Sequence, residues 1–177
     1  MNNTSEVKTR FQTRVLAEII IFVSLATALS FIIVYALPQG GSITLASMVP
    51  IIWLSLRRGP KVGIFAGVLY GFIQFGIMPY AYYPVQVLLD YPLAFGCLGL
   101  AAFFKKQPLI GTVVAITGRF LMHFISGFAY FAPMFAPDLN PYIYSAVYNA
   151  SYLIPEMAIS VFIIYLLQKS NVLRAYM

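Results

Sequence analysis

Charged residues are scarce in this sequence, since Asp, Glu, Lys and Arg make up only 9% of its 177 residues. An average soluble domain has about 25%. Apolar residues account for 61% of the chain, which leaves too few polar side chains to cover a water-exposed surface of ordinary polarity. The composition therefore excludes a typical soluble domain and predicts a membrane protein.

Cysteine is nearly absent as well. The one cysteine, Cys97, lies inside an apolar run, so there is neither a disulfide framework nor a cysteine-based metal site. We interpret Cys97 as a small buried apolar residue. We expect neither a metal nor a cofactor in this protein.

The motifs of several enzyme classes are missing too. No glycine-rich phosphate loop ending in Lys-Ser or Lys-Thr occurs, so the chain cannot supply ATP hydrolysis itself. A hydrolase or transferase inside the membrane would have to use His123 with Asp90 or Glu156, and the chain has no nucleophile elbow or metal motif to support one. We predict that the protein is not an enzyme.

Six apolar runs predict six membrane helices, because a span needs about 20 residues. The second run is short and contains Pro50. No small-residue cleavage site follows the first run, so we interpret it as a membrane helix and not as a removed signal. We expect a cytoplasmic segment at 1–14, a six-helix membrane domain at 15–168 and a cytoplasmic tail at 169–177. The runs are Val15–Leu37, Ile43–Leu56, Val62–Met78, Pro84–Phe104, Pro108–Phe131 and Tyr142–Leu167.

The net charge of +6 indicates topology and not nucleic-acid binding, because the basic residues form short clusters between apolar runs and no stripe beside exposed aromatics. The loops on the other side carry only Asp138. By the positive-inside rule both termini are cytoplasmic. The predicted fold class is an all-α integral protein of the cytoplasmic membrane with six transmembrane helices. The residues that set this orientation are Lys8, Arg10, Arg14, Arg57, Arg58, Lys61, Lys105, Lys106, Lys169 and Arg174.

Four glycines recur at intervals of four in the third run, namely Gly59, Gly63, Gly67 and Gly71. Small residues at this spacing allow close helix packing in membranes, and we interpret them as a packing face inside the bundle. We find no internal repeat of the kind that builds a complete transporter from two halves. This absence favours a module that works with partner subunits.

Ionisable side chains inside membrane spans are costly and indicate a functional site. Glu18 lies four residues after Arg14, and we expect these two to pair near the cytoplasmic end. Arg119 either forms a structural ion pair with Asp90 or contacts a ligand. His123 either makes a hydrogen bond between helices or contacts a ligand. The polar groups within the predicted spans are Glu18, Asp90, Arg119, His123, Glu156 and the amide of Asn149.

Two predicted helices present matching polar and aromatic faces. Arg119 and His123 lie four residues apart on the fifth. On the sixth, the four-residue series consists of Tyr144, Tyr148, Tyr152 and Glu156. Tyrosines alone are also typical of the membrane interface, but together with the polar groups of the outer half they predict a small-molecule pocket. Asp90 and Glu156 against Arg119 leave one negative charge, which favours an organic cation held partly by cation–π contacts.

Four segments agree with one known family in type, order and spacing. They are PQGGSITLASMVPIIWLSLRRGPKVG (38–63), YYPVQVLLDYPLAF (82–95), GRFLMHFISGFAYF (118–131) and IYSAVYNASYLIPE (143–156). The chain resembles the thiamine-specific substrate-binding component, or S component, of energy-coupling factor (ECF) transporters. The resemblance covers nearly the whole chain and implies six membrane helices, a vitamin bound near the outer face, a membrane coupling subunit and two cytoplasmic ATPases.

The resemblance also implies the site residues. Asp90 and Tyr91 match the acidic-Tyr pair that meets the cationic vitamin, and Phe131 falls where some members stack a tryptophan on the thiazolium ring. Two departures stand out: Gly41 lies near a loop position that can hold a stacking tryptophan, and Ile20 and Ser24 replace alanines of the coupling face. The implied substrate-binding residues are Tyr80, Asp90, Tyr91, Arg119, His123, Phe131, Tyr144 and Asn149.

These features predict a high-affinity thiamine (vitamin B1) binding and uptake subunit of an ECF transporter. The alternative is a stand-alone ion-coupled carrier of thiamine or a related organic cation, in which Glu156 or Asp90 relays protons. The expected partners are thiamine, membrane lipid, the coupling subunit and two ATPase subunits, and no nucleic acid.

Overall fold

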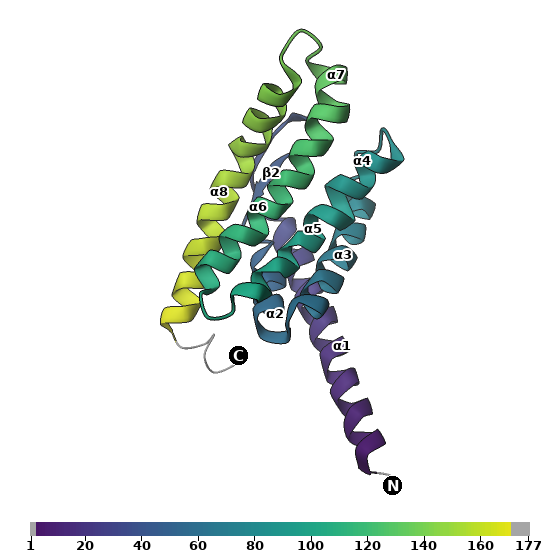
Figure 1. Ribbon diagram of the computed structural model, residues 1–177, viewed down its shortest axis with the longest axis vertical. Helices are drawn as coiled ribbons and strands as arrows, with labels where there is room; N and C mark the ends of the chain where they lie inside the picture. Colours follow the sequence, from purple (N-terminus) through teal and green to yellow (C-terminus); the bar gives the residue numbers. More distant parts are fainter. Residues whose placement is uncertain (1–2, 171–177) are drawn as a thin grey trace.

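The computed structural model describes residues 3–170, which form an elongated bundle of helices with one small β-hairpin (Figure 1). Two short segments, η2 and η4, are π-helical, while η1 and η3 are 3₁₀-helical. In chain order the elements are α1 (Asn3–Ser30), β1 (Ile33–Ala36), η1 (Pro38–Gly40), β2 (Ser42–Thr44), α2 (Val49–Arg58), α3 (Pro60–Ile77), α4 (Pro84–Leu88), η2 (Leu89–Leu93), α5 (Ala94–Gly96), η3 (Cys97–Phe104), α6 (Pro108–Ser126), η4 (Gly127–Phe131), α7 (Ala132–Phe135) and α8 (Pro141–Lys169).

Proline opens each membrane-length helical segment after α1, at Pro60, Pro84, Pro108 and Pro141. The first turn of a helix has no use for the missing N–H, and the fixed φ of proline suits that position. At α8 the side chain of Asn140 adds a cap by accepting from two backbone N–H groups at 3.0 and 3.2 Å. The loops between the predicted runs therefore end where proline allows a helix to begin.

Within the described residues, five helical segments are long and apolar enough to cross a membrane. Their positions agree with five of the six predicted runs. They are Gln12–Ser30, Pro60–Ile77, Pro84–Phe104, Pro108–Phe135 and Pro141–Lys169.

The predicted second span is not confirmed by length. In that run only α2 is helical, and its ten residues extend about 15 Å, half the thickness of a bilayer core. Ile51, Ile52, Leu54 and Leu56 of α2 are fully buried, so this helix is part of the protein core. The count of six spans stays a prediction.

The prediction that residues 15–37 form one helix, within an all-α fold, is wrong beyond Ser30. There the chain forms an antiparallel hairpin that pairs Ile33 with Thr44 and Ala36 with Ser42. The β-branched residues of this stretch favour extended backbone. The turn between the strands has positive φ angles at Gln39 (58°) and Gly40 (90°), a conformation that a continuing helix cannot include.

The described ends of α1 and α8 lie at the same end of the bundle, which is also the end of the α2–α3 and η3–α6 connections (Figure 1). Five basic residues lie in these connections or in the helix ends beside them, namely Arg57, Arg58, Lys61, Lys105 and Lys106. The arrangement agrees with the predicted clustering of basic residues on one side. Their cytoplasmic location stays a prediction.

The interpretation of the glycine stripe as a packing face is confirmed for three of the four glycines. A Cβ added at Gly63 would lie 2.5 Å from Cβ of Ser55, and Gly67 and Gly71 face the backbone of Phe95 and Tyr91 in the same way. Gly59 instead forms the turn into α3, with a φ of 96°. Helix α3 thus packs directly against the segment that carries Asp90.

The predicted Glu18–Arg14 pair is present, with Nε of Arg14 3.7 Å from a Glu18 carboxylate oxygen. Glu18 also accepts from Arg58 at 2.6 Å and from Arg57 at 3.2 Å. The carboxylate of Glu18 therefore ties α1 to the end of α2.

Candidate functional site

All eight predicted site residues line one cavity, on the side of the bundle away from the described ends of α1 and α8 (Figure 1). Helix α8, the η4 end of α6, η2, the α3–α4 loop and the β-hairpin surround it. The eight are Tyr80, Asp90, Tyr91, Arg119, His123, Phe131, Tyr144 and Asn149. Residues of five separate chain segments thus converge on one place.

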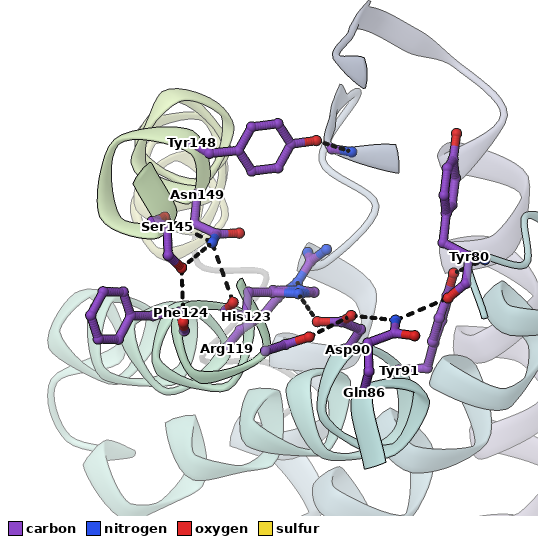
Figure 2. Close-up of polar contacts among 12 residues, drawn as sticks. Tyr80, Gln86, Asp90, Tyr91, Arg119, His123, Phe124, Ser145, Tyr148 and Asn149 are labelled. Atoms are coloured by element: carbon purple, nitrogen blue, oxygen red, sulfur yellow. Dashed lines mark hydrogen bonds and ion pairs between the residues drawn. The ribbon is translucent and has the colours of Figure 1, made fainter. Parts of the chain in front are cut away.

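Asp90 lies in the π-helical segment η2, two residues before Pro92. Proline lacks the N–H that an α-helix would use here, and such π segments occur often at functional sites. The Asp90 carboxylate accepts hydrogen bonds from Nε2 of Gln86 at 2.6 Å and from Oγ of Ser126 at 2.8 Å, and its other oxygen lies 3.0 Å from Nδ1 of His123 (Figure 2). Three side chains therefore fix the orientation of this carboxylate.

Arg119 contacts His123, and no Arg119–Asp90 ion pair is present among the described residues, so the interpretation of a direct pair is wrong. Nε of Arg119 donates to Nε2 of His123 at 3.2 Å. Because a guanidinium cannot accept a hydrogen bond, Nε2 carries no proton, and Nδ1–H is left to donate to Asp90. The guanidinium also lies 4.3 Å from the ring centre of Phe95 and donates to Sδ of Met48 at 2.8 Å.

His123 makes hydrogen bonds between helices, which was one of the two roles that the sequence allowed. Its side chain joins Arg119 of α6 to Asp90 of η2, while its backbone carbonyl accepts from Nδ2 of Asn149 on α8 at 3.3 Å. Oδ1 of Asn149 in turn accepts from the hydroxyl of Tyr152 at 2.9 Å. The polar wall of the cavity is therefore one connected network across three segments.

Aromatic rings form a second wall of the cavity. Tyr144 and Tyr148 stack on α8, with ring centres 6.1 Å apart and planes at 14°. Phe131 meets Tyr82 edge-on at 5.7 Å. The hydroxyl of Tyr91 accepts from the backbone N–H of Tyr80 at 2.9 Å and donates to the Met78 carbonyl at 2.7 Å, which fixes the α3–α4 loop beside the cavity.

The turn of the β-hairpin covers one side of the cavity. The Gly41 N–H donates to the hydroxyl of Tyr148 at 3.0 Å, and this hydroxyl donates to the Pro38 carbonyl. A Cβ at Gly41 would lie 2.8 Å from that same hydroxyl and 2.9 Å from the Tyr152 ring. Tyr148 and Tyr152 therefore occupy the space that a side chain at position 41 would need.

Glu156 does not line the cavity, although the sequence placed it in the charge balance of the pocket. It is 2% exposed, and one carboxylate oxygen accepts from the backbone N–H of Thr44 and from Oγ1 of Thr44. Glu156 thus contacts the base of the hairpin. Among the lining side chains, Asp90 is the one carboxylate.

Sequence reasoning did not name several further lining residues as site residues. Tyr148 and Tyr152 belong to the four-residue series on α8, which was a usable signal. Gln74 comes from α3 and carries no sequence signal. The lining residues beyond the predicted eight are Gln39, Gly40, Gly41, Ser42, Gln74, Met78, Phe95, Gly127, Ser145, Tyr148 and Tyr152.

The chain is similar to known proteins over most of its length. Residues 16–174 match the family model described as thiamine transporter protein. The chain belongs to this family. Thiamine transporter ThiT of Bacillus subtilis (strain 168) is 36% identical over 172 residues, covering 86% of this chain and 88% of that protein. Thiamine transporter ThiT of Lacticaseibacillus paracasei is 25% identical over 122 residues, covering 58% and 61%.

A solved structure of ThiT from Listeria monocytogenes has the same fold. Its TM-score is 0.81 at 24% identity, with 90% of this chain and 96% of that chain covered. The resemblance predicted from the four sequence segments is therefore confirmed. Membership in the thiamine transporter family, together with five membrane-length apolar helices, makes this a multi-pass protein of the cell membrane.

Proposed function

We propose that this protein binds thiamine in the cavity described above and serves as the substrate-binding subunit for its uptake. The observation that carries the proposal is the convergence of all eight predicted site residues on one cavity in a chain of the thiamine transporter family. Two relatives named thiamine transporters match this chain, one over 88% and the other over 61% of its own length. Their names support thiamine as the ligand.

The charge of the cavity suits the thiazolium cation. Asp90 receives hydrogen bonds from Gln86 and Ser126, which are neutral, and from His123, whose Nε2 carries no proton. Such donors satisfy the carboxylate oxygens without supplying an opposite charge. The negative charge therefore stays available to a cationic ligand, and the surrounding aromatic faces add cation–π attraction.

The polar wall suits the neutral part of the ligand. Arg119 uses its Nε and Nη1 groups inside the protein, and its guanidinium has further N–H donors. We expect these to meet an uncharged acceptor of the ligand, and Asn149 to contact it beside them. Tyr144 and Tyr148 supply a stacked pair of rings against which a flat heterocycle packs.

Transport against a gradient requires an energy source that this chain does not contain, because it has no phosphate-binding loop. We therefore propose that the protein works with a membrane coupling subunit and two cytoplasmic ATPases, as the ECF resemblance implies. Apolar residues on α1, among them Leu16, Ile20, Ile21 and Leu25, are exposed, and this face is open to lipid or to the coupling subunit.

A stand-alone ion-coupled carrier is the second candidate. One observation favours it: the Glu156 Oε2 atom is buried and has no hydrogen-bond partner in the described structure. A buried carboxylate oxygen without a partner is a suitable place for a transported proton to bind. Uptake of labelled thiamine into vesicles that contain this protein alone would favour the carrier. Uptake that requires the coupling subunit and ATP supports the proposed subunit.

The direct test of the ligand is to purify the protein from cells and identify the co-purified small molecules by mass spectrometry. We expect thiamine, and titration calorimetry on the stripped protein should show high-affinity binding of one thiamine per chain. A protein that carries no thiamine and gives no heat on thiamine addition would overturn the proposal.

A further inference from the structure

Gln86 does not line the cavity, but it bonds both to Asp90 and to the α3–α4 loop, which do. It lies in α4, one turn before Asp90, and its side chain is fully buried. The Nε2 group donates to Oδ2 of Asp90 at 2.6 Å and to the backbone carbonyl of Tyr80 at 2.9 Å. The Oε1 atom accepts from the backbone N–H of Tyr82 at 3.0 Å. Figure 2 shows the bonds of Gln86 to Asp90 and to Tyr80. With the bond from Tyr82, one amide joins the carboxylate to the α3–α4 loop at two points.

The arrangement uses both N–H donors of the amide and its oxygen in a single orientation. Flipping the amide would turn its oxygen toward the Asp90 carboxylate, where two acceptors repel. A glutamate would do the same, and an apolar side chain would satisfy neither end. The geometry therefore requires glutamine in particular at position 86, and not merely a buried polar residue.

The loop held by Gln86 contributes to the cavity. Tyr80 lines it, its ring packs against Gly40 of the hairpin turn, and Tyr82 contacts Phe131. The rigid planar amide of Gln86 links the Asp90 carboxylate to the backbone of Tyr80 and Tyr82. If the carboxylate moves, the amide and the loop backbone must therefore move with it.

We infer that Gln86 is a positioning residue for ligand binding, which acts through Asp90 and couples the orientation of this carboxylate to the Tyr80–Tyr82 loop. This inference rests on the proposed thiamine site. Gln86 itself does not contact the ligand in this proposal. Its effect on affinity must therefore depend on the charge at position 90.

The test is a double-mutant cycle of Gln86→Met and Asp90→Asn, with thiamine affinity measured by titration calorimetry. Methionine keeps the length of the side chain and removes all three hydrogen bonds. We expect Gln86→Met to weaken binding by about 10- to 100-fold, as for the loss of a hydrogen bond to a charged group. In the Asp90→Asn background the same change should cost less than about threefold.

Thr112→Val is the matched control, because Thr112 is equally buried, but within residues 3–170 its hydroxyl bonds only to the Pro108 carbonyl of its own helix. It should bind thiamine like the parent. If Gln86→Met does not fold, Gln86→Asn replaces it, since its amide is one methylene too short to reach both Asp90 and the loop, and the same loss is expected.

Three outcomes decide the matter. A parent that binds thiamine while the Gln86 variant binds within about twofold of it overturns this inference alone. An equal loss in both backgrounds shows a general structural effect and also overturns it. A parent that does not bind thiamine overturns the proposed function, and this inference with it.

Discussion

Glu156, near the middle of α8, binds the residue that ends β2: its Oε1 accepts from both the backbone N–H and the side-chain hydroxyl of Thr44. The hydroxyl of Ser47 lies 2.7 Å from that of Thr44 and extends the contact into the turn before α2. The two partners are 112 residues apart in sequence. This buried carboxylate thus fixes the base of the hairpin whose other end covers the cavity.

Replacing Glu156 by alanine should destabilise the protein, because the buried backbone N–H of Thr44 would lose its carboxylate acceptor, and the Thr44 hydroxyl would keep only Ser47 as a partner. Each unsatisfied group costs about 1–3 kcal/mol. Glu156→Gln keeps one acceptor oxygen and should lose less. Thermal unfolding of the detergent-solubilised protein measures both, and a glutamine variant as unstable as the alanine variant would contradict the role of the Thr44 contact.

Asp90→Asn should weaken thiamine binding strongly while the protein still folds. Removing one member of a buried charge pair typically costs about 2–5 kcal/mol, which corresponds to about 30-fold to several thousand-fold in Kd. Titration calorimetry measures the loss, and an unchanged elution volume on gel filtration checks the fold. Binding within about twofold of the parent would refute the assigned role.

Arg119→Ala should also weaken thiamine binding, because it removes the hydrogen bond that orients His123 and the contact over Phe95. We expect a loss of about 10- to 100-fold. Arg119→Lys keeps the charge but not the planar fork of donors, so its affinity should lie between the two. If both variants bind like the parent, Arg119 is a packing residue only.

Gly71→Ala should disturb the segment that holds Asp90, because the added Cβ would lie 2.5 Å from the Tyr91 carbonyl oxygen. Overpacking of this kind costs about 1–3 kcal/mol, seen as a lower unfolding temperature. Gly76→Ala in the same helix is the control, since a Cβ there meets nothing within 4 Å. Equal effects of the two substitutions would show that helix propensity, and not packing against η2, is being measured.

The topology is testable with single cysteines in a Cys97→Ala background. Tyr82, Asp138 and Lys105 are all exposed. Tyr82 belongs to the α3–α4 loop and Asp138 to the α7–α8 loop, whereas Lys105 belongs to the η3–α6 connection. The two loops lie at the end of the bundle opposite to this connection (Figure 1). Cysteines at 82 and 138 should react with a membrane-impermeant maleimide in intact cells, whereas one at 105 should react only after lysis. Labelling at 105 in intact cells would reverse the orientation.

The sequence by itself determined that this is a membrane protein, where its five long apolar helices lie, and which residue types form its cavity. These features depend on local properties: the length of apolar runs, the position of prolines, and the spacing of four residues that aligns Arg119 with His123 and Tyr144 with Tyr148. Hydrophobicity and helical periodicity can be read from neighbours in the chain. The rarity of ionisable groups inside apolar runs indicated Asp90.

Only the tertiary structure decided how these residues are connected. The hairpin replaced the end of the first predicted helix because residues 33–36 find hydrogen-bond partners in 42–44. Arg119 bonds to His123 and not to Asp90, and Glu156 bonds to Thr44. Gln86 lies between Asp90 and the α3–α4 loop. The Glu156–Thr44 contact depends on packing between segments 112 residues apart, which no local pattern specifies. Arg119 and His123, like Gln86 and Asp90, are four residues apart, so helical spacing allows these pairs. Which of several polar neighbours each group bonds to was decided by the packing around it.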